Sequence, residues 1–150
     1  MKYVLFVLLF VSYSAFSKDE LKQVYLSFES DYMSNNGEDY SKWLTDQYEI
    51  VQTMHIPNLG SDSRRVTGKQ MLESMKKMNK PNATPSSTLE NTRVHLKDDS
   101  RFCATSTTVT HANISGTAYE EKETRKVCFI KIMSEFKASE HKIDVYYKAL

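Results

Sequence analysis

The segment Arg101–Phe136, RFCATSTTVTHANISGTAYEEKETRKVCFIKIMSEF, decides the fold. Ser115-Gly116 near its middle predicts a two-residue hairpin turn between two long strands, because glycine favours the backbone conformation that such turns need. Polar clusters, of which Ala138-Ser139-Glu140 is the last, bound further β-rich runs. The predicted strands are Thr88–Lys97, Arg101–Ile114, Thr117–Phe136 and His141–Ala149. We therefore expect an antiparallel meander to end the chain.

The two cysteines fit this hairpin. If Ile114 lies opposite Thr117, a count of eleven residues outward along each strand places Cys103 directly across from Cys128. In a hairpin of this register the eleventh pair is not hydrogen-bonded, and its Cα atoms lie about 4.5 Å apart, within disulfide range. The register therefore predicts a Cys103–Cys128 disulfide, and the alternative is two unpaired buried thiols.

The N-terminal half of the chain reads as helices around one strand. Apolar side chains recur at helical spacing from residue 21, and that stripe comprises Leu21, Val24, Tyr25, Phe28 and Tyr32. A second, shorter helix is expected through Trp43, followed by a strand at Tyr48–Ile56 and a third helix after a Thr67–Gln70 capping box. Helices that precede a run of strands indicate the α+β class.

The first 17 residues predict export. Met1–Ser17 has one lysine, an apolar run from Tyr3 to Val11, and small residues up to the end of the segment. These are the three parts of a cleavable signal peptide, whereas a membrane-spanning helix needs about 20 apolar residues. We expect residues 18–150 to form one mature domain in the periplasm or outside the cell, an oxidising space that favours a disulfide.

Composition excludes several classes of function. The chain carries 20 Lys+Arg against 19 Asp+Glu, so it lacks the basic excess of a nucleic-acid-binding protein. Its 2 cysteines cannot form a zinc cage without histidine, and its 4 histidines are spread over separate predicted strands. We therefore expect no metal, no cofactor and, once the leader is removed, no membrane association.

Three stretches resemble the nuclear-transport-factor-2-like superfamily, which includes SnoaL-like and ketosteroid-isomerase-like domains. They are VYLSFESDYM at 24–33, GEDYSKWLTD at 37–46 leading into YEIVQ, and RRVTGKQMLESM at 64–75. The resemblance implies a cone-shaped, curved antiparallel sheet packed around three N-terminal helices, with an apolar pocket open at one end. It also implies a homodimer through the outer face of the sheet.

The resemblance places the first helix along the pocket, although plain core packing is the alternative for its aromatic side chains. The ligand-binding candidates are Tyr25, Tyr32, Trp43, His55 and His95. Enzymes of this type keep an acid near the end of the first strand, and no carboxylate stands between Glu49 and Asp62 here.

We therefore expect an exported domain that binds a small apolar or amphipathic molecule, or a protein partner, without catalysis. One alternative is an isomerase, dehydratase or cyclase that uses His55 as its base, together with a tyrosine. The other alternative is a small exported inhibitor or immunity-type protein.

Overall fold

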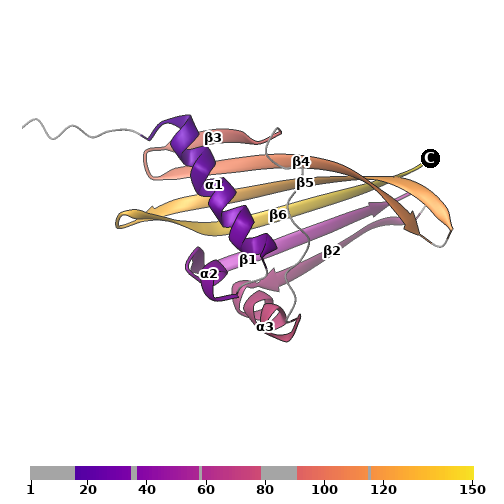
Figure 1. Ribbon diagram of the computed structural model, residues 1–150, viewed down its shortest axis with the longest axis horizontal. Coiled ribbons are helices and arrows are strands. Elements are labelled where there is room, and N and C mark those ends of the chain that lie inside the picture. The colour runs from indigo at the N-terminus through magenta and orange to yellow at the C-terminus, as the bar shows by residue number, and fades with distance from the viewer. Residues whose placement is uncertain (1–15, 35–36, 58, 79–90, 115) are drawn as a thin grey trace, which may run out of the picture.

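A computed structural model describes residues 16–34, 37–57, 59–78, 91–114 and 116–150. Three helices and six strands follow one another along the chain (Figure 1). They are α1 (Lys18–Met33), α2 (Gly37–Ser41), β1 (Leu44–Ile56), β2 (Gly60–Thr67), α3 (Gly68–Met78), β3 (Arg93–Asp98), β4 (Arg101–Ile114), β5 (Thr117–Ile132) and β6 (Glu135–Ala149). Predicted leader residues 1–15 lie outside the described ranges. Within those ranges, no helix has the length and apolar character needed to cross a membrane.

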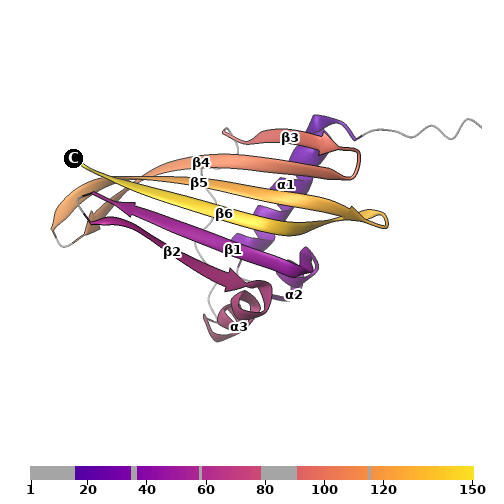
Figure 2. The same cartoon turned by 180° about the vertical axis from the view of Figure 1, so that it is seen from behind.

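The strands form one curved sheet in the order β2-β1-β6-β5-β4-β3, which does not close on itself. All neighbouring strands are antiparallel except β1 and β6, which run parallel. The predicted α+β class is confirmed, and the sheet is mixed because the end of the chain returns beside the first strand. α1 crosses one face of the sheet, and no helix of the described residues covers the opposite face (Figure 2).

One predicted turn is wrong. The strand predicted at Thr117–Phe136 ends earlier, and Met133-Ser134 forms the turn, with Met133 at φ 57°. Ala138-Ser139-Glu140 instead lies inside β6, where Ser139 is the extra residue of a bulge and donates a hydrogen bond to the Cys128 carbonyl at 3.2 Å. Small polar residues favour bulges and turns alike. The buried side chains of Phe136 and Ala138 decide between the two, because only a strand turns both onto the core.

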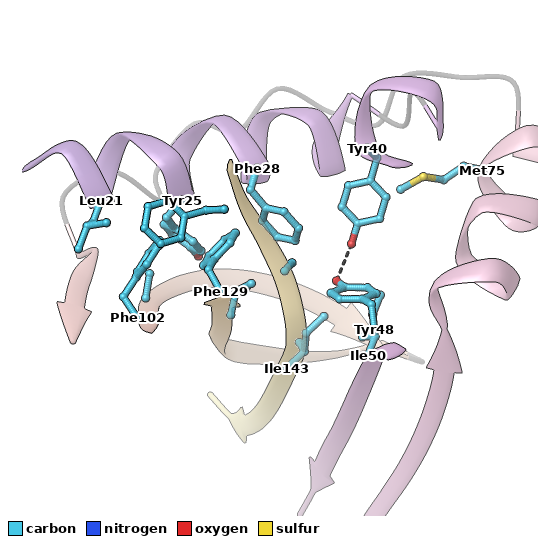
Figure 3. Packing of buried hydrophobic residues seen from close by; sticks show 14 of the residues in the cluster. Leu21, Tyr25, Phe28, Tyr40, Tyr48, Ile50, Met75, Phe102, Phe129 and Ile143 are labelled. Atoms are coloured by element: carbon cyan, nitrogen blue, oxygen red, sulfur yellow. Dashed lines mark hydrogen bonds between the residues drawn. The ribbon is translucent and has the colours of Figure 1, made fainter. Parts of the chain in front are cut away.

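Aromatic side chains fill the space between α1 and the sheet (Figure 3). Phe28 lies at the centre of this core, with ring centroids 5.4 Å from Tyr40 and from Phe129 and 6.1 Å from Trp43. Met75 of α3 closes the core beside Tyr40. Edge-to-face packing of this kind stabilises a core beyond the area it buries. The predicted stripe on the first helix is therefore its buried face.

Side chains cap the two long helices. Ser17 accepts from the Glu20 backbone N–H, and the Glu20 carboxylate accepts from the Ser17 backbone N–H at 2.7 Å. The predicted capping box at Thr67 and Gln70 is confirmed in the same way before α3. Cleavage of a leader after Ser17 would remove the cap of α1. Since such a cap contributes about 1 kcal/mol, α1 would lose stability by about that amount.

The predicted disulfide is confirmed. Ile114 pairs with Thr117, the register continues unbroken along β4 and β5, and Cys103 lies directly opposite Cys128. The two sulfurs are bonded, and the Cα atoms are 4.0 Å apart. The bond lies on the face of the sheet away from α1, since the neighbouring Phe102 and Phe129 point into the core.

Replacing both cysteines by serine should lower the free energy of unfolding by about 3 kcal/mol, because the bond closes a loop of 25 residues in the unfolded chain. Urea denaturation of the oxidised protein and of the double variant measures the difference. The oxidised protein treated with reductant serves as the chemical control and should match the variant. Equal midpoints for all three samples would contradict the prediction.

Candidate functional site

The inner face of the sheet carries a cluster of polar side chains beneath α1. Tyr25, Glu29 and Tyr32 fall at i, i+4 and i+7 of the helix, so they share the face that contacts the sheet. Ser106 of β4 and Arg125 of β5 lie opposite each other in the sheet register. Tyr25 and Ser106 share a hydrogen bond of 2.7 Å between their hydroxyls. A helix and two central strands therefore meet at this cluster.

Arg125 holds the cluster together. Its Nη1 donates to Glu29 Oε2 at 2.8 Å, and its Nε donates to Glu123. Its guanidinium also lies over the Tyr32 ring, 5.5 Å from the centroid. The side chain of Arg125 is 16% exposed and that of Glu29 is 5% exposed. The pair is thus a nearly buried salt bridge, which costs desolvation and gives weak support for a purely stabilising role.

Burial shifts the titration of these groups. It raises the pKa of Glu29, and the nearby Arg125 guanidinium opposes that rise. Burial also raises the pKa of Tyr25, to which the Glu29 charge adds, and the pKa of Tyr32. For Arg125, burial lowers the pKa, but the charges of Glu29 and Glu123 outweigh it and leave the pKa raised. A buried group with a specific charge partner and a shifted pKa is a candidate for a functional site.

A chain of hydrogen bonds runs beside this cluster from α2 to β6. The Tyr40 and Tyr48 hydroxyls lie 2.5 Å apart (Figure 3), and the Tyr48 hydroxyl lies 2.9 Å from His141 Nδ1. Burial, with a contribution from the charge of Arg125, lowers the pKa of His141 to about 3. The imidazole is therefore neutral at physiological pH.

Two buried polar atoms in this region have no hydrogen-bond partner among the described residues. They are Glu29 Oε1 and His141 Nε2. The Tyr32 ring packs against His141, with the two ring centroids 5.4 Å apart. A buried acceptor or donor without a partner costs about 1–3 kcal/mol, so each is suited to a ligand or an ordered water.

The cluster becomes accessible at Arg125 and Glu123, whose side chains are 16% and 18% exposed. The Nη2 group of Arg125 makes no hydrogen bond to the described residues, since Nε and Nη1 make the hydrogen bonds to Glu123, Glu29 and Met33. Farther along the same inner face lie three partly buried apolar side chains, Met54, Val66 and Tyr147. Next to them Arg64 donates to Gln52 Oε1 at 2.7 Å. A free donor and an apolar surface thus share one face of the sheet.

The structure does not bring the five predicted binding residues together. Tyr25 and Tyr32 belong to the inner cluster. Trp43 lies at the edge of the core, where its indole donates to Asp31 Oδ2 at 2.7 Å. His95 pairs with Cys103 in the sheet, and both point to the outer face.

His55 lies on that outer face as well. Its ring stacks on Tyr146 with centroids 4.1 Å apart, and its Nδ1 lies 2.8 Å from the Ser61 hydroxyl. Asp144 Oδ1 lies 3.7 Å from Nε2, beyond hydrogen-bond range. These groups come from β1, β2 and β6 on the outer face of the sheet.

Sequence reasoning missed Glu29, Arg125 and His141, although each carried a signal. Glu29 follows Tyr25 by four residues and therefore falls on the buried face of its helix. Arg125 precedes the inward-facing Val127 by two residues, and His141 precedes Ile143 by two. In each case a charged or titratable residue occupies a position that the helix or strand repeat assigns to the core. That mismatch is the signal that could have identified them.

The arrangement defines a helix-covered, curved sheet whose inner face carries a charged cluster. No model of a known protein family matches the sequence, and no curated protein matches it. Solved structures do match. The association domain of CaMKII from C. elegans shares 15% identity over 84% of this chain and 93% of that chain, with a TM-score of 0.58.

Two further solved structures are similar in fold. An NTF2-like protein of unknown function in nutrient uptake from Rhodospirillum rubrum shares 11% identity over 83% of this chain and 97% of that chain, with a TM-score of 0.57. The hexachlorocyclohexane dehydrochlorinase LinA-type3 from Novosphingobium barchaimii shares 8% identity over 87% of each chain, with a TM-score of 0.54. The chain therefore has the nuclear-transport-factor-2-like fold, as the sequence resemblance implied. Since an enzyme and an association domain both have this fold, the site must decide the function.

Proposed function

We propose that the protein binds a small, neutral, amphipathic molecule on the inner face of the sheet, with the polar end of the ligand at Arg125. The observation that carries the proposal is the buried cluster itself. It combines a free guanidinium donor at the accessible edge with a carboxylate oxygen that has no partner. Ligand sites are typically apolar surfaces with a few placed polar groups, and this face has both.

The charges of the cluster select the polar end of the ligand. Glu29 and Glu123 both contact Arg125, so the three side chains together carry a net negative charge when both carboxylates are ionised. An anionic ligand would be repelled by that charge. A hydroxyl group fits better, because it can accept from Arg125 Nη2 and donate to a carboxylate.

Binding without catalysis fits the state of the titratable groups. A general base works best when its pKa lies near the operating pH, whereas the pKa of His141 is lowered to about 3. Burial raises the pKa of Glu29, which would suit a base, but the ion pair with Arg125 holds its Oε2. His55, the base in the enzyme alternative, lies on the outer face, remote from this cluster. These features favour a binder over an isomerase, dehydratase or cyclase.

Export belongs to the same proposal. The Cys103–Cys128 disulfide supports an oxidising compartment, where such bonds persist. We propose that residues 1–17 are removed and that the domain acts in the periplasm or outside the cell. Mass spectrometry of the exported protein should find Lys18 as its first residue.

Replacing Arg125 by lysine tests the ligand site. Lysine keeps the positive charge beside Glu29 and loses the planar fork, including the free Nη2 donor. With 2-naphthol as the probe, calorimetric titration should show about a tenfold loss of affinity or more in Arg125→Lys, since a hydrogen bond to a charged group contributes about 1.5–3 kcal/mol.

Two variants on the outer face serve as controls. Arg93→Lys makes the same chemical change on β3, and His55→Gln removes the histidine of the enzyme alternative. Both should leave the affinity unchanged. Binding of 2-naphthol that is equally strong in wild type and Arg125→Lys, or that is lost in His55→Gln, would contradict the proposal. Naphthalene-2-carboxylate should bind more weakly than 2-naphthol, because the cluster repels anions.

A further inference from the structure

A concavity is lined by residues of α1, of α2 and the segment after it, and of the hairpin that joins β5 to β6. Its volume is about 500 Å³, which is the size of a small-molecule site. The apolar part of its lining comes from Val24 of α1, Trp43 after α2, and Phe136 of β6. Phe16 also lines the groove and packs edge-to-face on Phe136, with centroids 5.2 Å apart. Removal of residues 1–17 would therefore widen the groove at Phe136, while the other three residues remain.

The walls of this groove are tied together by backbone and indole hydrogen bonds. The Ala138 N–H donates to the Trp43 carbonyl at 2.6 Å, and Lys137 Nζ donates to the Lys42 carbonyl at 2.5 Å. The Trp43 ring packs edge-to-face on Phe28 and Phe129 of the core, at centroid distances of 6.1 Å and 6.5 Å. The indole is therefore fixed in place and forms a rigid apolar wall of the groove.

One carboxylate at the groove makes no ion pair with the described residues, although its charge, after the hydrogen bond to Asp39, contributes to the raised pKa of Lys42. Lys42 pairs with Asp39 at 2.8 Å, and Lys137 pairs with Glu135 at 2.7 Å. Asp31 has no ion pair with any described residue. Its Oδ2 accepts from the Trp43 indole at 2.7 Å, and its Oδ1 makes no hydrogen bond to the described residues. The indole bond also fixes the carboxylate at the edge of the apolar wall.

We infer that this groove binds a small organic cation, an amine with an aryl or alkyl body. The ammonium group pairs with Asp31 and donates to its Oδ1, while the apolar body covers Trp43, Val24 and Phe136. A charged hydrogen bond next to an aromatic wall is the usual means of recognising an amine, and cation–π attraction to the indole adds to it. This site is separate from the cluster at Arg125. The groove takes a cation, whereas the cluster takes a neutral ligand.

The single tryptophan of the chain makes the site measurable, because all tryptophan emission comes from Trp43. Phenethylamine should change that emission in a saturable way. Its neutral analogue 2-phenylethanol and its anionic analogue 3-phenylpropanoate should bind at least about tenfold more weakly, as expected when one charged hydrogen bond is lost. Equal affinity for the amine and the alcohol would overturn the inference, and so would unchanged emission at saturating amine.

Two matched variants locate the charge. Asp31→Asn keeps an oxygen that can accept from the indole and removes the negative charge, so it should abolish the preference for phenethylamine. Asp39→Asn removes a carboxylate that already has a lysine partner and should preserve the preference. Loss of the preference in Asp39→Asn and not in Asp31→Asn would overturn the assignment. Arg125→Lys should leave the amine titration unchanged, which separates this site from the proposed ligand site.

Discussion

Replacing Arg125 by methionine should lower the free energy of unfolding at pH 7 by about 3 kcal/mol or more. Methionine fills much of the same volume, so the main effect is to leave the Glu29 carboxylate, 5% exposed, without its cation. Removal of one partner of a buried ion pair costs about 3–5 kcal/mol, because an uncompensated charge stays in the interior. Urea denaturation followed by circular dichroism measures the change.

The double variant Glu29→Gln with Arg125→Met distinguishes a broken ion pair from lost packing. It removes both charges, so it should recover most of the stability that the single Arg125→Met variant loses. The cost in the single variant should also shrink at pH 5, since Glu29 already has a raised pKa and takes up a proton more readily there. A double variant as unstable as the single one, at both pH values, would show that Arg125 acts through packing alone.

Local patterns predicted most of the secondary structure. Helical spacing from Leu21 to Tyr32 identified α1, and the alternation of the hairpin around Ser115-Gly116 fixed the register that pairs Cys103 with Cys128. Both inferences use residues close together along the chain, where geometry follows from the repeat of one element. The parallel pairing of β1 with β6 joins Leu44 to Ala138, and no local repeat carries that information.

The turn at Met133-Ser134 shows the limit of turn chemistry. Met133 adopts a left-handed conformation, φ 57°, that glycine or asparagine usually occupies. The packing of Phe136 and Ala138 against the core fixes the turn, so tertiary contacts overrule the local preference. The packing of Phe136 and Ala138 also explains why residues 138–140 lie inside β6, with Ser139 as the extra residue of a bulge.

The candidate site was predicted only in part, for a physical reason. The aromatic stripe identified Tyr25 and Tyr32, because both lie on the helix face that contacts the sheet. The salt bridge from Glu29 to Arg125 joins residues 96 apart in the chain, so spacing along the sequence could not reveal it. The alternation of side chains along β1 does separate His55 from the core positions. Ile50 and Met54 face the core, whereas His55 faces the opposite side of the sheet.

Lowering the pH from 6.5 to 4.5 should destabilise the wild-type protein through His141 by about 2 kcal/mol. The histidine has a pKa of about 6.5 in the unfolded chain and about 3 in the folded protein, where burial excludes the charged form. Between these values the unfolded state binds one more proton than the folded state. Stability is therefore retained above pH 6.5 and falls by about 1.4 kcal/mol for each unit below it.

The variant His141→Gln isolates this effect from the other titrating groups. Glutamine can still accept a hydrogen bond from Tyr48 and does not titrate, so the mean slope of its stability between pH 6.5 and 4.5 should be flatter by about 1 kcal/mol per unit. His55→Gln is the matched control, because His55 lies on the outer face of the sheet, where its side chain is 30% exposed. Carboxylates such as Asp98, whose pKa is lowered to about 2 by its bonds to Ser100 and Arg101, contribute equally to all three proteins and cancel. If His141→Gln and wild type show parallel slopes, the pKa of His141 is not lowered by folding, which would contradict the prediction.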